Sequence, residues 1–265
     1  MEMQQPARTG AMQGQLWGTR AHEWAELQEG KVRPVYDAVL ARFAIAGKRV
    51  LDVGCGAGLF AQLAAEAGAQ VSGLDAAAGL IAVATARTPE GDFCVGEIEE
   101  LPYPDDTFEL VTGFNSFQFA AAPVNALREA GRVAKPGAPV TMTVWGDPED
   151  CEAATTLSAL APLLPSPPPG APGPFALSER GVLQALAGEA GLHAVDTTDV
   201  VCVWEYSDVQ TAVRALSSSG PAARAIAAAG EDAVSEAFGD AVAPFVKTDG
   251  TVSMQNVFRY LTATA

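Results

Sequence analysis

Three glycines, each separated from the next by one residue, form the segment of this sequence best suited to bind a ligand. Gly54, Gly56 and Gly58 follow a short apolar run, and an alanine-rich helical pattern begins at Leu59. Glycine has no Cβ, so the backbone there can adopt positive φ and approach a ligand closely, while the next helix offers unpaired N–H groups. The pattern predicts a strand, a tight turn and a helix that cradle a nucleotide-like ligand.

An acidic residue strengthens this interpretation. Asp75 stands at the carboxyl end of a second apolar strand pattern, 17 residues after Gly58. A carboxylate near that distance binds the two hydroxyls of a ribose in nucleotide-binding βαβ units. The glycines depart from the dinucleotide pattern G-x-G-x-x-G, whose third glycine would stand at Leu59. Two other interpretations stay open, namely a purely structural turn and an Asp75 that caps a helix beginning at Ala76.

The elements that must position these residues alternate along the chain. Strands are expected at 50–53, 70–75, 93–95, 108–114 and 139–145, and helices at 59–67, from 76 onward and at 124–133. This alternation predicts a parallel sheet with helices on both faces. Further strands are expected at 195–206 and 252–262, with an alanine-rich helical segment at 209–245 between them.

The segments outside the alternating region are expected to form a cap over a single domain of 265 residues. Residues 1–47 read as an N-terminal helical cap whose first helical turns end near Gly30, and residues 48–146 as the cofactor-binding core. Residues 147–250 read as a cap insertion that includes the sixth strand, and residues 251–265 as the last strand. Within the insertion, 149–164 has a helical pattern, the proline-rich segment 165–174 is expected to be an extended lid or linker, and Ser178 is expected to cap a helix.

Composition excludes several classes of function. The formal net charge of −16 disfavours nucleic acid and anionic membranes as partners, and no apolar run approaches the roughly 20 residues of a membrane span. The N-terminus is polar and lacks a signal-peptide core, so the expected compartment is the cytoplasm. The four cysteines are far apart without C-x-x-C pairs, and no metal site is expected. The sequence makes no prediction of oligomeric state.

Four ordered stretches resemble the class I S-adenosylmethionine-dependent methyltransferases, specifically members with small-molecule acceptors. The stretches are residues 50–58, 73–75, 96–109 and 128–137. The resemblance covers about residues 45–147. It implies an α/β fold with a Rossmann-like doubly wound sheet of seven strands, five parallel and the last two an antiparallel hairpin, together with a helical cap. The implied cofactor is S-adenosyl-L-methionine.

The resemblance also implies cofactor contacts at particular positions. The three glycines would pack against the methionine moiety, and Asp75 would hold the ribose. Glu97 stands where the family usually has an Asp that binds the adenine amino group, and the backbone N–H of Ile98 would face the ring. Asp52 is expected to organise the glycine loop. The other implied positions are Cys55, to which no nucleophilic role is assigned, Ala76, and the pair Phe114 and Asn115 near the methionine end.

Methyl transfer needs little from side chains, because the sulfonium carbon is already electrophilic and displacement is accelerated mainly by alignment. A hydroxyl acceptor would benefit from a base. His22, on the N-terminal segment, is the candidate, with a solvated helix histidine as the alternative; His193 is expected to begin a strand away from the cleft. Candidate acceptor-pocket residues, for which core packing or a surface position is the alternative, are Trp17, Trp24, Tyr36, Phe117, Gln118, Phe119 and Trp145.

The sequence therefore predicts an enzyme that transfers a methyl group from S-adenosylmethionine to O, N or C of a small, largely apolar metabolite, such as a secondary metabolite. One alternative is a related enzyme that uses the bound cofactor without consuming it, for a cyclisation or rearrangement. The other is a non-catalytic regulatory protein that binds the cofactor.

Overall fold

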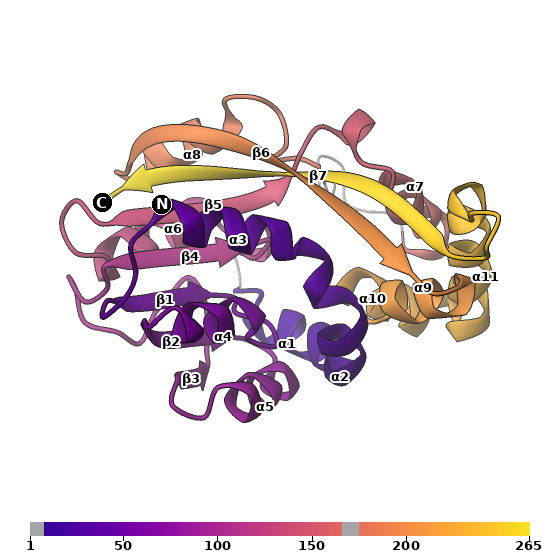
Figure 1. The fold of residues 1–265 in the computed structure, drawn as a ribbon, viewed down its shortest axis with the longest axis horizontal. Coiled ribbons are helices and arrows are strands. Elements are labelled where there is room, and N and C mark those ends of the chain that lie inside the picture. Colours follow the sequence, from indigo (N-terminus) through magenta and orange to yellow (C-terminus); the bar gives the residue numbers. More distant parts are fainter. Residues whose placement is uncertain (1–7, 166–174) are drawn as a thin grey trace, which may run out of the picture.

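The computed structural model describes residues 8–165 and 175–265, which fold around one seven-stranded sheet with the order β3-β2-β1-β4-β5-β7-β6 (Figure 1). The strands are β1 (Arg49–Val53), β2 (Gln70–Asp75), β3 (Asp92–Val95), β4 (Leu110–Phe114), β5 (Pro139–Trp145), β6 (His193–Tyr206) and β7 (Val252–Thr264). Strands β1 to β5 pair in parallel, whereas β7 pairs antiparallel with both β5 and β6. This arrangement confirms the predicted fold class.

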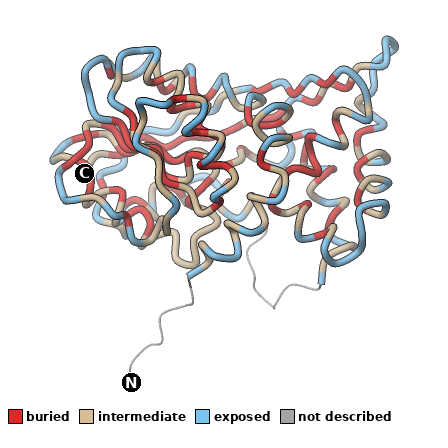
Figure 2. The backbone as a smooth tube through the Cα atoms, turned by 90° about the horizontal axis from the view of Figure 1, so that it is seen from below, coloured by how far each residue is buried: buried red, intermediate tan, exposed pale blue. Residues whose placement is uncertain are grey.

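Helices cover both faces of the sheet because successive side chains of a buried strand point to opposite faces. Val50 of β1 belongs to one apolar core, together with residues of α3 (Arg33–Arg42) and α4 (Leu59–Glu66). The next residue, Leu51, belongs to the other core, with residues of α6 (Pro123–Val133) and α8 (Val182–Glu189). Helix α5 (Ala78–Arg87) packs beside β2 and β3. Figure 2 shows the buried residues concentrated along the sheet.

The N-terminal segment contains a local distortion. Helix α1 (Gly10–Gly18) and the short α2 (Ala21–Glu23) are followed by a π-helical turn, η1 (Trp24–Gln28), and a 3-10 turn, η2 (Glu29–Val32). The π-helical turn ends at Gln28, two residues before the predicted end near Gly30, and the 3-10 turn η2 leads directly into α3. A π-helical turn is rare and is often found at functional sites.

The C-terminal half is more broken than predicted. Segment 149–164 divides into η4 (Pro148–Asp150), α7 (Ala154–Ala159) and η5 (Ala161–Leu163), and segment 209–245 into α9 (Val209–Ser217), α10 (Gly220–Ala229), α11 (Glu231–Val242) and η6 (Ala243–Phe245). Ser219 caps α10 by accepting a hydrogen bond from the N–H of Ala222, and Gly230 ends it at φ +92°. Helix α8 begins after Gly181 rather than at a Ser178 cap. The expected lid at 165–174 lies almost wholly outside the described residues.

The long strands β6 and β7 connect the sheet to these helices. Figure 1 shows both strands running past the ends of the parallel strands to the group formed by α7, α9, α10 and α11. The strand order reverses between β1 and β4, and ligands of open α/β sheets bind at the carboxyl ends of the strands beside such a reversal. The fold therefore places a site where the glycine loop faces the N-terminal and C-terminal helices.

Candidate functional site

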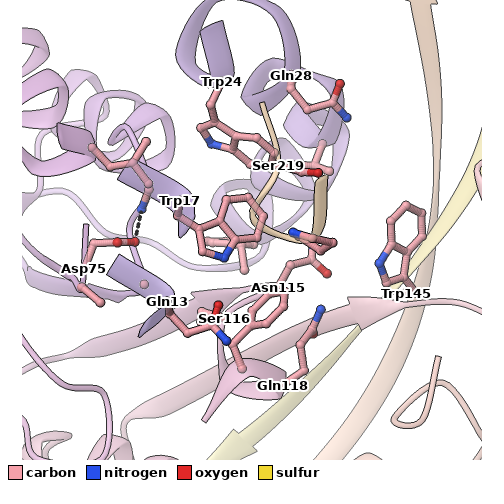
Figure 3. Close-up of a pocket in the computed structure, with 18 of the residues that line it drawn as sticks. Gln13, Trp17, Trp24, Gln28, Asp75, Asn115, Ser116, Gln118, Trp145 and Ser219 are labelled. Atoms are coloured by element: carbon pink, nitrogen blue, oxygen red, sulfur yellow. Dashed lines mark hydrogen bonds between the residues drawn. The ribbon is translucent and has the colours of Figure 1, made fainter. Parts of the chain in front are cut away.

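One elongated cavity lies at this edge of the sheet, and its two ends differ in composition. We call the part lined by Gly54, Gly56, Asp75 and Glu97 the glycine end. We call the remainder, which is walled mainly by aromatic and apolar side chains, the aromatic end. Figure 3 shows Asp75 on one side of this space and Trp145 on the other, with Trp17 and Asn115 between them.

The glycine loop has the positive φ angles that its sequence predicts. Gly54, Gly56 and Gly58 adopt φ of +73°, +56° and +81°, a region that other residues rarely enter. A Cβ on Gly54 would lie 2.3 Å from the Ser116 Cβ, and one on Gly58 would lie 2.7 Å from the Ala84 Cβ. Gly54 and Gly56 line the cavity, whereas Gly58 does not and instead permits close packing of α4 against α5.

Asp75 shapes the loop and faces the cavity as well. Its Oδ2 accepts a hydrogen bond from the N–H of Gly56 at 3.0 Å, and its Oδ1 accepts one from the N–H of Ala77 at 2.8 Å. Helix α5 begins at Ala78 rather than Ala76, so Asp75 binds the N-cap residue of this helix. Burial raises the pKa of the Asp75 carboxyl group, and the two N–H donors oppose that rise. Each carboxylate oxygen keeps lone pairs for a ligand.

Glu97 and Ile98 line the glycine end beneath helix α1. The Glu97 Oε2 accepts a hydrogen bond from the N–H of Gly10, the first residue of α1, at 2.9 Å. Close packing fixes this helix further, because a Cβ on Gly14 would lie only 2.2 Å from the carbonyl oxygen of Ala76. Helix α1 therefore covers the loops that carry Asp75, Ala76 and Glu97.

Two loop-associated residues lie behind the cavity wall. Asp52 is buried in β1, where its Oδ1 accepts a hydrogen bond from the Thr112 hydroxyl at 2.8 Å. Burial raises the pKa of the Asp52 carboxyl group to about 7, with the nearby Glu29 and Asp75 carboxylates adding to the rise. Cys55 is also buried, with its sulfur against Gly73, and burial raises the pKa of its thiol well above the ordinary value. Neither residue lines the cavity.

Phe114 and Asn115 bring the end of β4 to the middle of the cavity. Phe114 packs against Tyr36 with a ring-centroid distance of 4.6 Å. Asn115 adopts φ of +53°, while its backbone N–H donates to the Thr143 carbonyl at 3.0 Å. The Asn115 Oδ1 is buried and has no hydrogen-bond partner among the described residues. This strained residue thus presents an unpaired polar group to the cavity.

Aromatic side chains from segments far apart in sequence form the aromatic end. Trp145 of β5 lies beside Phe258 of β7 with ring centroids 4.6 Å apart, and Phe258 stacks on Trp204 of β6 at 6.4 Å. Trp17 contacts Trp24 edge to face at 4.8 Å. Residues that line this end and were not predicted from the sequence include Gln28, Leu157, Leu160, Trp204, Leu216, Ser219, Phe238 and Phe258.

The structure brings together most of the predicted site residues but not all of them. His22 is exposed on α2 and does not line the cavity, so the geometry does not place it as a base. Phe117, predicted in the acceptor pocket, is fully buried in the core beneath α6. The reason is its 3-10 turn, η3 (Phe117–Phe119), which turns Gln118 and Phe119 toward the cavity instead. His193 begins β6 and lies outside the cavity walls, which is where the sequence led us to expect it.

Charge is confined to the glycine end. Asp75 and Glu97 are the only ionisable carboxylates among the described lining residues, and no lysine, arginine or histidine lies among them. Tyr36 lines the cavity, and burial raises the pKa of its hydroxyl well above the ordinary value. Over residues 8–165 and 175–265, no group of three His, Cys, Asp or Glu could hold a metal ion. No described helix is long and apolar enough to cross a membrane.

Comparison with known proteins gives a consistent picture. Residues 51–142 match the family model described as a methyltransferase domain. The chain is 37% identical over 116 residues to demethylmenaquinone methyltransferase of Renibacterium salmoninarum, a match that covers 44% of this chain and 48% of the relative. It is 34% identical over 130 residues to ubiquinone biosynthesis O-methyltransferase of Hahella chejuensis, covering 44% and 54%. The chain thus spans about half the length of the curated relatives it matches.

Solved structures share the fold over most of the chain. The cyclase SpnF superimposes with a TM-score of 0.54 at 25% sequence identity, covering 87% of this chain and 79% of that protein. An S-adenosylmethionine-dependent methyltransferase from Aquifex aeolicus superimposes with a TM-score of 0.54 at 14% identity, covering 93% and 98%. The shared fold therefore extends beyond residues 51–142.

Proposed function

We propose that this chain is a class I S-adenosylmethionine-dependent methyltransferase, as the family model over residues 51–142 and the curated relatives support, and that it methylates O, N or C of a small, largely apolar acceptor. One observation carries the proposal. The cavity continues without a break from the glycine loop and its carboxylates to a separate aromatic end, so it offers a place for a donor and a place for an acceptor.

The residues of the glycine end fit S-adenosyl-L-methionine. Gly54 and Gly56 line the cavity with backbone and carry no side chain, which suits the methionine moiety. Asp75 would accept hydrogen bonds from the ribose hydroxyls, and Glu97 would accept one from the adenine amino group. The buried Asn115 Oδ1, which lacks a described partner, would accept a hydrogen bond from the amino group of the methionine moiety. When bound, the cofactor supplies an electrophilic methyl carbon.

The chain itself contributes positioning and exclusion of water. Helix α1 covers the donor through Gly10 and Gly14, and the aromatic end holds the acceptor beside it. The rings of Tyr36 and Phe114 near the middle would favour a cationic sulfonium through their π faces. No Asp, Glu, His or Lys is found among the described residues that line the aromatic end, so orientation of a competent nucleophile provides most of the acceleration in this proposal.

The names of the curated relatives support a small-molecule acceptor, because both refer to methylation in quinone biosynthesis. The aromatic end is consistent with an acceptor of that general character.

The proposal is tested by measuring how much S-adenosylhomocysteine, the product left by the donor, forms with each methylated acceptor. The purified protein is titrated with S-adenosylmethionine and S-adenosylhomocysteine in a calorimeter, and then incubated with the donor and a panel of small phenols, amines and enols. We expect binding of both cofactor forms and one S-adenosylhomocysteine for each methylated product. Product formed without S-adenosylhomocysteine would instead indicate use of the cofactor without consumption, as in a cyclisation. Failure of both cofactor forms to bind would overturn the proposal.

A further inference from the structure

Gln28 is a polar residue that the mechanism above does not use. It is the last residue of the π-helical turn η1, it is 6% exposed, and it lines the aromatic end of the cavity. In Figure 3, Gln28 and Gln118 lie on opposite sides of the space beside Asn115, with Trp145 on a third side. Gln28 is therefore placed to meet a ligand that occupies this end.

A single hydrogen bond orients the Gln28 carboxamide. The buried Tyr206 hydroxyl donates to the Gln28 Oε1 at 2.8 Å. None of the hydrogen bonds within residues 8–165 and 175–265 uses the Gln28 Nε2 amide. Because Tyr206 occupies the oxygen, the carboxamide offers its N–H donors to the cavity. A ligand oxygen at this position would accept a hydrogen bond that no described residue receives.

The backbone that carries Gln28 is anchored to the glycine loop by the next residue. The Glu29 carboxylate accepts hydrogen bonds from Arg87 at 2.5 Å and from the N–H of Leu59 at 3.3 Å. Arg87 also donates to the Ala57 carbonyl at 2.8 Å. This anchoring fixes the end of the π-helical turn, so Gln28 is held relative to the donor site rather than presented on a mobile loop.

The surroundings of Gln28 select against charge. The side chains that wall this end are aromatic, aliphatic or neutral polar, and none of those described is charged. An ionised group enclosed here would lose its hydration without gaining a counter-charge, which is unfavourable. Across the space, Gln118 presents a neutral carboxamide to the same end of the cavity.

Resting on the proposed methyl transfer, we infer that the acceptor is an uncharged aromatic molecule whose hydroxyl or carbonyl oxygen binds the Gln28 carboxamide. Gln28 is then a specificity-determining residue, and Tyr206 is the positioning residue that turns its N–H donors toward the acceptor. The site thus selects acceptors that carry an uncharged hydroxyl or carbonyl group, and it does not attract a charged group.

Three size-matched probes test this inference: 2-naphthol, naphthalene and naphthalene-2-carboxylate. Their affinities for the full-length protein saturated with S-adenosylhomocysteine are measured by equilibrium dialysis at pH 7.5. We expect 2-naphthol to bind at least fivefold more tightly than naphthalene and at least tenfold more tightly than the carboxylate. In Gln28→Leu the preference for 2-naphthol over naphthalene should fall to within twofold, while naphthalene affinity is kept.

Tyr206→Phe gives an independent readout, because it keeps the ring and leaves Gln28 in place but removes the hydroxyl that orients it. The preference for 2-naphthol over naphthalene should fall two- to fivefold, an effect that a purely structural role would not produce. Gln210→Leu, at an exposed position on α9, is the matched control and should behave as the wild type.

Several results would overturn the inference: no binding of 2-naphthol at its solubility limit, preference for the carboxylate, or an unchanged preference in both variants. Affinity for S-adenosylhomocysteine is measured separately for each protein. Failure of the proposed function would appear as lost cofactor binding, whereas failure of this inference would appear in the probe ratios of a protein that binds cofactor normally.

Discussion

The glycine end and the aromatic end adjoin in one cavity but are built differently. The glycine end consists of backbone and short side chains from loops that follow consecutive parallel strands, within residues 54–98. The aromatic end consists of large side chains that come from the N-terminal turns, β5 to β7 and the C-terminal helices, between Trp17 and Phe258. The first end is set by local geometry of the sheet edge, whereas the second depends on how distant segments pack. The acceptor specificity of such a protein can therefore change through side chains of the aromatic end while the architecture of the sheet stays the same.

The two ends are joined by one buried ion pair, and breaking it should have the largest effect. Glu29 of η2 is 3% exposed and pairs with Arg87 of α5 beside the glycine loop. Arg87→Met would leave the carboxylate buried without its partner, so we expect a loss of about 3 kcal/mol in the free energy of unfolding at pH 7.5. Denaturant titration measures this loss.

Two controls sharpen that experiment. Burial already raises the pKa of Glu29, and loss of Arg87 should raise it further. A raised carboxyl pKa removes stability as pH increases from the unfolded value toward the folded one, so Arg87→Met should be less destabilised at pH 5.5 than at pH 7.5. The double variant with Glu29→Gln should recover part of the loss. Equal losses at both pH values without recovery would show that the pair does not join the two ends.

A change confined to the glycine end should weaken cofactor binding. We expect Asp75→Ala to weaken S-adenosylmethionine binding by about 2–3 kcal/mol, because hydrogen bonds to a charged group are lost. Calorimetry gives the affinity, and Gln28→Leu, at the other end, should leave it within twofold. Asp75→Asn keeps an oxygen for one of the two backbone N–H donors and separates loop support from ligand contact. An Asp75→Ala variant with wild-type affinity would refute the ribose assignment.

The carboxylates near the glycine end should also give it a distinctive pH dependence. The folded pKa of Asp52 is about 7, above the usual 3.9 or so of an exposed Asp, so this group lowers stability as pH rises from about 4 to 7. Relative to the wild type, the free energy of unfolding of Asp52→Asn should therefore increase by about 2 kcal/mol over this interval. This value is about half of what the full difference between the folded and unfolded pKa would give. Denaturant titrations at pH 4.5 and 8 measure the gain.

Asp199 of β6 should affect the pH dependence of stability in the opposite direction to Asp52. Hydrogen bonding and charge from Arg259 lower the pKa of Asp199, so its stabilisation is present above the unfolded pKa and is lost on acidification. Asp199→Asn should be destabilised at pH 8 and much less so at pH 4.5. The same sign of pH dependence for Asp52→Asn and Asp199→Asn would contradict the assigned environments.

Helix α1 should be sensitive to a single methyl group where it covers the glycine end. In Gly14→Ala the new Cβ would meet the Ala76 carbonyl at 2.2 Å, so we expect a net loss of about 1 kcal/mol despite the better helix propensity of alanine. Gly239→Ala on α11 is the matched control, because its new Cβ would meet nothing within 4 Å. This substitution should increase the free energy of unfolding by about 0.5–1 kcal/mol. Thermal unfolding and cofactor affinity measure both variants.

The difference between the two ends also explains what sequence could predict. Strands β2 and β5 have their predicted bounds, and the residues of the glycine end were found because adjacent positions in sequence stay adjacent in a loop. Trp204 and Phe258 were missed because only antiparallel pairing of β7 with β5 and β6 brings them to Trp145. No periodicity within one strand reveals which distant strand will lie beside it.

The sequence also did not predict which way the individual side chains of a turn point. Phe117 and Gln118 are neighbours, yet one is buried in the core and the other faces the cavity. Gln28 reaches the cavity through a π-helical turn, which an ordinary 3.6-residue period does not describe. Rare backbone geometry therefore accounts for both the misplaced residue and the unpredicted one.

The smallest effect is expected at His22, and it tests whether the aromatic end works without a base. His22 is exposed on α2 and separate from the cavity walls, so His22→Ala should keep cofactor affinity and turnover within twofold of the wild type. Exposed substitutions away from packed features usually change stability by less than about 0.5 kcal/mol. A tenfold loss of turnover, with a lost ionisation in the pH profile, would show that α2 moves to bring His22 to the acceptor. The aromatic end would then work by proton transfer as well as by orientation, and the contrast with the glycine end would need revision.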